Sequence, residues 1–362
     1  MYNEPKYIKI KKDILSMIEN NEIHVGDKIP SESELTEKYN VSRHTVRKAL
    51  DSLREKDILD KRQGVGTFYI GEVKTTNNLI GFISISVHDY IFSDIMKGID
   101  EVLHDTGYQT MVGNSKDNIE REKEIIDNFV RKGIDGLIIE PAKSAYKENN
   151  LLKLKKIARR GIPVVILDSD FSASEFSYVI VDDKKGGKIA ASYFIEKGHK
   201  RIAQIYKDSH IPGKNRLKGF KEEIKNSNIA FKEKYIKKYK FSELETPGKF
   251  YEEIQQVVNE LMSDKNPPTG IFCFNDQVAI NVVENLIQMG FNVPGDVSVI
   301  GYDDSKFVQL NSINITSIAH PKEKAGKKAA RLILDKQCNI NGQEKIVFEP
   351  LLVERASVKQ IN

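Results

Sequence analysis

The sequence predicts an α/β protein in two parts: a small helical N-terminal domain and a much larger body of parallel sheets flanked by helices. Two observations predict this division. Residues 29–69 read as two short helices joined by a tight turn and followed by a glycine-containing hairpin. From Leu79 onward, short apolar runs alternate with amphipathic helical segments, which is typical of parallel sheets built from α/β units. We therefore expect a domain at 1–70, a linker at 71–78 and a body at 79–362.

The two short helices of the first domain carry local start signals. Ser31 and Glu34 have the S-x-x-E spacing of a capping box, so a helix should begin at Glu32. Ser42 can cap the second helix, on which three apolar residues recur at i, i+4 and i+7, namely Val46, Leu50 and Leu53. A further helix over residues 5–21 is expected to pack behind these two.

A second face of the capped helix is basic. Arg43 and Arg47 lie four residues apart, with His44 and Lys48 beside them. Such a helix suits the major groove of DNA, where arginine bonds guanine edges or holds phosphates. Residues 61–67, KRQGVGT, then predict a basic hairpin whose tip needs glycine torsions. One basic pair alone would be explained more simply as solvated charges on an ordinary surface helix. The capping box, the turn, the apolar stripe, the two arginines and the basic hairpin together predict a winged helix-turn-helix.

Composition limits the class of protein. The chain has 362 residues, 40% of them hydrophobic, and a net charge of only +4. Its first 72 residues carry equal numbers of acidic and basic side chains, so DNA binding must depend on where the charges lie. Cys273 and Cys338 show neither metal-ligand spacing nor a disulfide framework. The N-terminus lacks a signal-peptide core and no run approaches the ~20 apolar residues of a membrane span, which predicts a cytoplasmic protein without a membrane partner.

The body is expected to contain parallel strands separated by helices. The predicted strands are the apolar runs LIGFISI, YQTMVGN, IDGLIIE, IPVVILD, RIAQIY, TGIFCFN and VSVIGY. Five connectors end in a glycine that fits the left-handed position after a helix, at Gly107, Gly133, Gly161, Gly198 and Gly290. The number of units makes two lobes plausible, although periodicity alone does not show where the chain would cross between them.

Polar side chains follow several predicted strands, at the edge where open α/β sheets bind ligands. These candidates are Glu140, Asp168, Asn275, Asp276, Asp303 and Asp304. With Arg216 on a following helix and aromatic side chains nearby, they would form a surface for bonding sugar hydroxyls. The aromatic candidates are Tyr90, Phe92, Phe171 and Tyr302. An Asp or Asn after a strand also often caps the next helix, and for Asn275 and Asp304 this alternative stays open.

Other functional classes find less support in the sequence. Neither of the glycine-rich phosphate loops G-x-G-x-x-G and G-x-x-x-x-G-K-S/T follows any strand, and G-x-S-x-G and H-E-x-x-H are also missing, so no cofactor, metal or catalytic residue is predicted. An enzyme could use Asp182 with Asp183, or Asp303 with Asp304, but adjacent strand residues point to opposite faces. A transport sugar-binding protein would not need the predicted DNA-binding domain.

Two resemblances sharpen these expectations. IPSESELTEKYNVSRHTVRKALDSL followed by RQGVGTF resembles the DNA-binding domain of GntR-type regulators. This resemblance implies DNA contacts from the recognition helix and the wing, at Ser42, Arg43, His44, Thr45, Arg47, Gln63 and Gly64. Where some members have an arginine on the preceding helix, this chain has Ser33, so one contact could be missing.

The body resembles the effector-binding part of LacI-type repressors, through GIFCFNDQVAINVVENLIQMGFNVPGDVSVIGYDDSKF, ITSIAHP and FEPLLVERAS. That resemblance implies the two-lobed fold of periplasmic sugar-binding proteins, with three crossovers between lobes. It also implies ligand contacts at Asp168, Arg216, Asn275 and Asp303.

The combination of both parts, with DYIF, IDGLIIEPAKSA and VDDKKGG, is most similar to arabinose-responsive repressors. This similarity implies L-arabinose as effector and Lys6 as a further DNA contact. It adds ligand contacts at His88, Asp89, Tyr90, Phe92, Glu140 and Asp183. The expected protein is a homodimer that binds palindromic operator DNA and is released by a small sugar.

Overall fold

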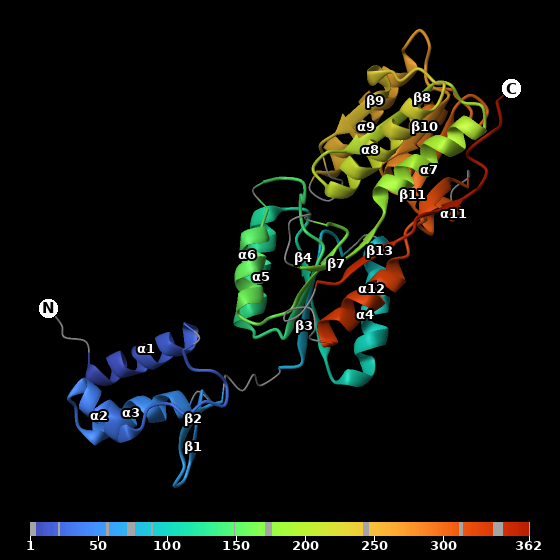
Figure 1. Ribbon diagram of the computed structural model, residues 1–362. Coiled ribbons are helices and arrows are strands. Elements are labelled where there is room, and N and C mark those ends of the chain that lie inside the picture. Colours follow the sequence, from blue (N-terminus) through green and yellow to red (C-terminus); the bar gives the residue numbers. More distant parts are fainter. Residues whose placement is uncertain are drawn as a thin grey trace. The chain divides into compact units, whose positions relative to one another are not determined.

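The computed structural model describes residues 5–20, 22–55, 58–70, 77–87, 90–147, 149–170, 176–241, 246–310, 314–335 and 343–361. The chain forms two compact units, Met1–Thr76 and Asn77–Asn362 (Figure 1). Residues 71–76 of the predicted linker lie outside the described residues.

The N-terminal unit consists of three helices and a hairpin: α1 (Lys6–Glu19), α2 (Glu32–Tyr39), α3 (Arg43–Arg54), β1 (Leu59–Arg62) and β2 (Gly66–Tyr69). The predicted capping box is confirmed, because Ser31 Oγ accepts from the Glu34 N–H and the Glu34 carboxylate accepts from the Ser31 N–H. Ser42 caps α3 by accepting from the Thr45 N–H. Asn40 adopts a left-handed φ of 46° and turns the chain sharply between α2 and α3.

The core of this unit is formed by one apolar stripe from each helix. Val46, Leu50 and Leu53 of α3 are buried as predicted, against Ile10 and Ile14 of α1. Strand β2 pairs with β1 and also bonds to the segment before α2, since the Ile29 N–H donates to the Thr67 carbonyl. Backbone hydrogen bonds on both edges of β2 thus attach the hairpin to the chain segment that leads into α2.

The second unit contains two six-stranded sheets, which define an N-lobe and a C-lobe. The N-lobe sheet has the order β13-β7-β6-β5-β3-β4 and all its pairs are parallel. Its strands are β3 (Leu79–Ser84), β4 (Gln109–Asn114), β5 (Gly136–Ile139), β6 (Val164–Leu167), β7 (Ser177–Val181) and β13 (Lys345–Phe348). Its helical elements are α4 (Tyr90–Leu103), η1 (His104–Thr106), α5 (Ile119–Arg131), α6 (Leu151–Arg159) and α12 (Lys322–Leu334).

The C-lobe sheet has the order β14-β12-β11-β10-β8-β9, and only β14 runs antiparallel to its neighbour. Its strands are β8 (Ile202–Lys207), β9 (Ile236–Tyr239), β10 (Gly270–Cys273), β11 (Ser298–Asp303), β12 (Thr316–Ala319) and β14 (Leu351–Val353). Its helical elements are α7 (Asp183–Glu196), α8 (Ile211–Asn226), η2 (Glu233–Tyr235), α9 (Pro247–Met262), α10 (Asp276–Gln288) and α11 (Phe307–Leu310).

Helices cover both faces of each sheet, because strand residues alternate between two apolar layers. In the N-lobe, Phe82 of β3 packs in the layer with α4 and α12, whereas Ile83 packs in the layer with α5 and α6. In the C-lobe, Phe272 of β10 lies in the layer with α7 and α8, and Ile271 in the layer with α9 and α10. Figure 1 shows α4 beside α12. The inner strands β5, β6, β10 and β11 are therefore buried on both faces, as their continuous apolar sequences predicted. The edge strand β4 is only partly buried.

The chain crosses between the lobes three times, from β7 to α7, from β12 to α12 and from β13 to β14. The structure confirms all seven predicted strands and adds five: β7, β9, β12, β13 and β14. The five predicted connector glycines all have positive φ, for example 72° at Gly133. No helix among the described residues is long and apolar enough to cross a membrane.

Candidate DNA interface and ligand site

The predicted recognition helix α3 presents a polar face to solvent. Ser42, Arg43, His44 and Arg47 are exposed, and Thr45 is half-buried. Ser42 Oγ lies 3.0 Å from Thr45 Oγ1 at the start of the helix, so the two hydroxyls occupy one site at its N-terminus. This placement is what groove contacts from the first turns of a recognition helix require.

Glu32 connects α3 to the hairpin. Its two carboxylate oxygens accept from Arg47 Nε at 2.9 Å and from Lys61 Nζ at 2.7 Å. These hydrogen bonds, from Lys61 and then Arg47, lower the pKa of Glu32. One carboxylate therefore fixes a side chain of the recognition helix relative to one of the wing. The sequence reasoning missed Glu32, which looked only like the first residue of a capped helix.

The candidate DNA contacts of the wing tip and of α1 are exposed to solvent. Gln63 and Gly64 are exposed between β1 and β2, and Gly64 has a φ of 76°, which favours glycine. Lys6 Nζ donates to the Asn40 carbonyl at 3.3 Å, next to the start of α3. Lys6 is thereby held close to the recognition helix despite its distance in sequence.

In the second unit, Arg216 is the centre of the candidate ligand site. Its Nε donates to Asp183 at 2.7 Å, and Nη1 donates to the Phe274 carbonyl at 2.6 Å. Nη2 lies 3.9 Å from Asp303, and the guanidinium lies over the Tyr302 ring. Burial opposes its charge, but Asp183, Tyr302 and Asp303 outweigh this effect and raise the pKa of Arg216. Three of the predicted ligand residues thus form one buried cluster.

Close packing of α7 on α8 creates this cluster. A Cβ on Gly219 would lie 1.8 Å from the Lys184 carbonyl oxygen, and one on Gly187 would lie 2.0 Å from the Arg216 carbonyl oxygen. Only glycine allows the two backbones to approach this closely. The approach places Asp183, the first residue of α7, within hydrogen-bond distance of Arg216 on α8.

The N-lobe contributes two carboxylates from the ends of neighbouring strands. Asp168 follows β6 in a left-handed conformation, and its Oδ1 lies 3.0 Å from His320 Nε2. Burial opposes ionisation of Asp168, yet the charges of His320, Arg216 and Lys322 lower its pKa. Glu140 follows β5 and accepts from Ser84 Oγ at 2.9 Å. His320 had not been predicted, although like the other candidates it directly follows a strand.

The remaining candidates differ in their placement. Asn275 caps α10, where its Oδ1 accepts from the Val278 N–H at 3.0 Å, so the capping alternative holds for this residue. Asp304 instead accepts from Arg355. Asp276 is fully buried, and its two oxygens accept from Ser305 N–H and Ser317 Oγ. We therefore correct its expected ligand contact to a structural role in tying α10 to the ends of β11 and β12.

The aromatic candidates are not all described. Phe92 stacks on Phe82 in the apolar layer of α4, with ring centroids 5.6 Å apart. Tyr302 is fully buried beneath Arg216. His88, Asp89 and Phe171, as well as Cys338, lie outside the described residues, and Tyr90 is described only as the first residue of α4.

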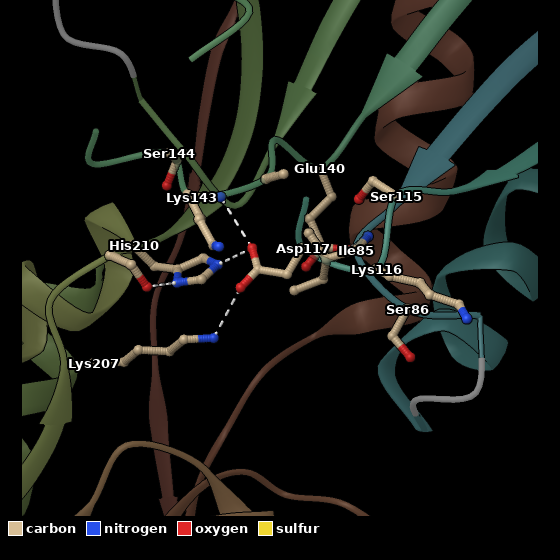
Figure 2. A network of polar contacts seen from close by, with 12 residues as sticks. Ile85, Ser86, Ser115, Lys116, Asp117, Glu140, Lys143, Ser144, Lys207 and His210 are labelled. Carbon is tan, nitrogen blue, oxygen red and sulfur yellow. Dashed lines mark hydrogen bonds and ion pairs between the residues drawn. The ribbon is translucent and has the colours of Figure 1, made fainter. Parts of the chain in front are cut away.

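A further polar cluster was not predicted at all. Asp117 follows β4 in the N-lobe and contacts Lys207 and His210 of the C-lobe, as Figure 2 shows. Asp117 is separated in sequence from Lys207 by 90 residues and from His210 by 93 residues, so no local motif connects it to them.

These features define a regulator in which a winged helix-turn-helix unit is joined to a two-lobed ligand-binding unit. Residues 6–68 match the model of bacterial regulatory proteins of the gntR family, and residues 191–358 match the periplasmic binding protein-like domain. The arabinose metabolism transcriptional repressor of Geobacillus stearothermophilus is 32% identical, over 99% of this chain and 98% of its own. That of Halalkalibacterium halodurans is 33% identical, over 99% and 97%.

Among solved structures, a LacI family transcriptional regulator from Enterococcus faecium with bound ribose aligns with a TM-score of 0.65 and 26% identity. The alignment covers 78% of this chain and 100% of that protein. The chain belongs to the family of the arabinose metabolism transcriptional repressors. Its N-terminal unit carries the DNA-binding domain of the gntR family of bacterial regulatory proteins. It is a sugar-responsive DNA-binding repressor, a class of regulator and not of enzyme.

Proposed function

We propose that this repressor binds L-arabinose between its two lobes and then leaves its operator. The carrying observation is the Arg216 cluster, in which a buried guanidinium is fixed by Asp183 beside the strand-end carboxylates Asp168 and Asp303. Charged groups fixed in this way can each accept or donate bonds to sugar hydroxyls in a defined direction. The choice of arabinose follows the two full-length relatives, which are arabinose metabolism repressors, and the choice of the L enantiomer follows the sequence resemblance to arabinose-responsive repressors.

The sugar contacts that we propose come from both lobes. They are His88, Asp89, Tyr90, Phe92, Glu140, Asp168, Asp183, Arg216, Asn275 and Asp303. Asn275 would donate to the sugar from its side-chain nitrogen, because its side-chain oxygen Oδ1 already caps α10. Asp183 would act partly through Arg216, to which it is hydrogen-bonded.

The DNA contacts that we propose lie on α3, the wing and Lys6. They are Lys6, Ser42, Arg43, His44, Thr45, Arg47, Gln63 and Gly64. A homodimer would bring two such surfaces to the halves of a palindromic operator, one helical turn apart or a multiple of it. Residues 71–78 would connect the DNA-binding unit to the body, and the protein would act in the cytoplasm.

Release from DNA requires that the sugar bind the released form more tightly than the operator-bound form, because a ligand shifts an equilibrium only by its differential affinity. Coupling of this kind is reciprocal. Operator DNA should therefore weaken sugar binding by the same factor as the sugar weakens operator binding.

The test is calorimetric titration of the full-length protein with L-arabinose, D-arabinose, D-xylose, D-ribose and D-galactose, followed by operator-release assays with each sugar. We expect heat and release with L-arabinose alone. If another pentose bound and L-arabinose did not, the protein would still be a repressor, but with a different effector. Ribose is the first alternative, because the Enterococcus faecium structure contains bound ribose. No heat with any sugar would contradict the proposed site.

A further inference from the structure

A buried ion pair joins the two lobes outside the proposed sugar contacts. Asp117 Oδ2 lies 3.0 Å from Lys207 Nζ, and Asp117 Oδ1 lies 3.0 Å from His210 Nε2. All three side chains are nearly inaccessible, with Asp117 only 1% exposed. In Figure 2 the carboxylate of Asp117 points at Lys207 and His210, while Lys116 points away from them. A carboxylate and an ammonium are this deeply buried only where each satisfies the other.

Further hydrogen bonds surround the pair. Ser209 Oγ lies 2.9 Å from His210 Nδ1, so the hydroxyl can donate to Nδ1 while Nε2–H donates to Asp117. Burial lowers the pKa of His210, and this effect outweighs the opposing charge of Asp117. Asp117 and Lys207 contact each other directly as a pair of opposite charges. Burial opposes ionisation of Asp117, but His210, Lys207 and the Lys143 N–H together lower its pKa.

The backbone that presents Asp117 is unusual. Lys116 and Asp117 both have left-handed φ, at 52° and 57°, although neither is glycine. Consecutive residues in this region are disfavoured and persist only where other contacts fix them. Here Ser115 N–H donates to the Ser84 carbonyl at 2.9 Å, and the Lys143 N–H donates to Asp117 Oδ1 at 3.0 Å. The turn is thus held in the conformation that directs the carboxylate to the C-lobe.

Each side of the pair is attached to an element of the proposed sugar site. On the N-lobe side, Ser84 bonds both the Asp117 turn and Glu140, since its carbonyl accepts from Ser115 and its Oγ donates to Glu140. On the C-lobe side, His210 is the residue before α8, the helix that carries Arg216. A Cβ on Gly213 would lie 2.0 Å from the Lys207 carbonyl, which fixes the first turn of α8 to Lys207.

Two further hydrogen bonds cross between the lobes beside the pair. The Ala145 N–H donates to the Ser209 carbonyl at 3.0 Å, and the Ile211 N–H donates to Ser144 Oγ at 3.1 Å. Both connect the loop after β5 with the start of α8. The contact therefore joins the loop that carries Glu140 to the helix that carries Arg216.

We propose that Asp117, Lys207 and His210 form an interlobe latch, in which Asp117 is a positioning residue that keeps Glu140 and Arg216 at the spacing needed to hold the effector. The latch does not touch the sugar. It slows effector release by resisting separation of the lobes. The effect on the sugar rests on the effector site proposed above, whereas the effect on the lobes does not.

The first experiment needs no effector. Hydrogen exchange, followed by mass spectrometry on the sugar-free full-length protein, reports the opening of the Ala145 and Ile211 amides. In Asp117→Asn, peptides covering 140–147 and 208–213 should exchange about tenfold faster or more, because the variant leaves Lys207 buried without its counter-charge. Peptides from α4 serve as the internal reference and should not change.

Two variants separate the latch from general destabilisation. The double variant D117N/K207M removes both charges, so no unpaired charge remains buried, and it should open the same two peptides without a further increase over D117N. Asp127→Asn breaks the partly exposed pair between Asp127 and Lys153 in the N-lobe and should leave both peptides unchanged. Two results would contradict the proposed latch. One is that these peptides exchange at the wild-type rate in the double variant, and the other is that exchange becomes faster evenly over the whole unit.

The second measurement is the rate of L-arabinose dissociation, by stopped-flow, on the same proteins. Both latch variants should release the sugar about tenfold faster or more, with an association rate that is unchanged or higher, because the lobes separate more readily. Faster exchange with unaltered dissociation would refute the positioning role of Asp117. If the wild type bound no L-arabinose while exchange still responded to D117N, the latch would stand and the proposed effector would fail.

Discussion

The guanidinium of Arg216 lies over the ring of Tyr302, with 3.5 Å between the guanidinium carbon and the ring centroid. The ring supports the cation from one side while Asp183 bonds its Nε from another. A planar guanidinium can use both contacts at once, which a lysine ammonium cannot. The orientation of Arg216 is thus fixed before any ligand arrives.

Arg216→Lys should therefore weaken sugar binding by at least about tenfold while operator binding persists, since the charge is kept but the stacked, directed geometry is lost. Arg216→Ala should be more severe and should also destabilise the body, by about 3–5 kcal/mol, because Asp183 is left buried without its partner. Calorimetry and operator-release assays measure the first effect, and urea unfolding the second. The control is Lys218→Ala, an exposed residue on the same helix. If the sugar released Arg216→Lys from the operator as it does the wild type, Arg216 would not be a ligand contact.

Arg47→Ala should weaken operator binding by about 1–3 kcal/mol per half-site, which is the value of a good arginine–base contact. Sugar binding should be unaffected, since Arg47 belongs to a separate unit. The matched control is Arg54→Ala, which removes the same charge from the last turn of α3. Fluorescence anisotropy with operator and scrambled DNA gives both affinities. Equal losses for Arg47→Ala and Arg54→Ala would indicate a general charge effect in place of a specific contact.

Gly219→Ala should destabilise the second unit by about 1–3 kcal/mol, as expected for overpacking, because its Cβ would overlap the Lys184 carbonyl oxygen. It should also weaken sugar binding, since any shift of α7 from α8 moves Asp183 away from Arg216. Gly248→Ala in α9 meets nothing within 4 Å and should be neutral or slightly stabilising. Urea unfolding compares the two variants. If Gly219→Ala unfolded at the same urea concentration as Gly248→Ala, helices α7 and α8 would have room for a methyl group at this position.

His199 predicts a pH dependence of stability. Its ring is buried, with Nδ1 3.0 Å from Thr269 Oγ1 and Nε2 3.2 Å from the Lys359 carbonyl, and burial lowers its pKa to about 4. In the unfolded chain the pKa of His199 is about 6.5, so below that pH the unfolded chain binds a proton that the folded chain does not bind until the pH is much lower. The folded state therefore loses stability as the pH falls from about 6.5 towards 4.

Thermal unfolding of the wild type and of His199→Gln between pH 7.5 and pH 4.5 measures this contribution. Other groups titrate in the same range, so the informative quantity is the difference between the two proteins. The melting temperature of the variant should fall less on acidification than that of the wild type. Parallel curves for both would mean that His199 does not titrate differently in the folded and unfolded chains.

The DNA-binding unit could be predicted closely from sequence because its signals are local. The Ser31 capping box, the Ser42 cap and the stripe of Val46, Leu50 and Leu53 each depend on neighbours within one or two turns. Most body strands were found for a similar reason, as apolar runs between helices. Strand β9 was missed because its sequence IKKY is short and half charged, which an edge position tolerates.

The candidate site could be predicted only in part. Strand-end residues such as Asp168 and Asp303 were found from topology, since parallel strands end at one edge. Whether such a residue faces a ligand or its own protein depends on distant partners, however. Asp276 accepts hydrogen bonds from Ser305 and Ser317, and Asp117 pairs with Lys207, which is 90 residues away in sequence. These contacts arise from tertiary packing and leave no periodic or spaced signal in the sequence.

The three crossovers also determine the order in which the protein can be completed during synthesis. Helix α12 and strand β13 belong to the N-lobe but emerge from the ribosome after strands β8 to β12 of the C-lobe. Until residue 334 is made, the Phe82 layer lacks the cover of α12, and until residue 348 is made, the N-lobe sheet lacks its edge strand β13. The last strand of the N-terminal unit, by contrast, already ends at Tyr69. A chain that terminates before residue 334 therefore contains the whole N-terminal unit but an incomplete N-lobe, and it leaves apolar residues of the sheet exposed, which favours aggregation.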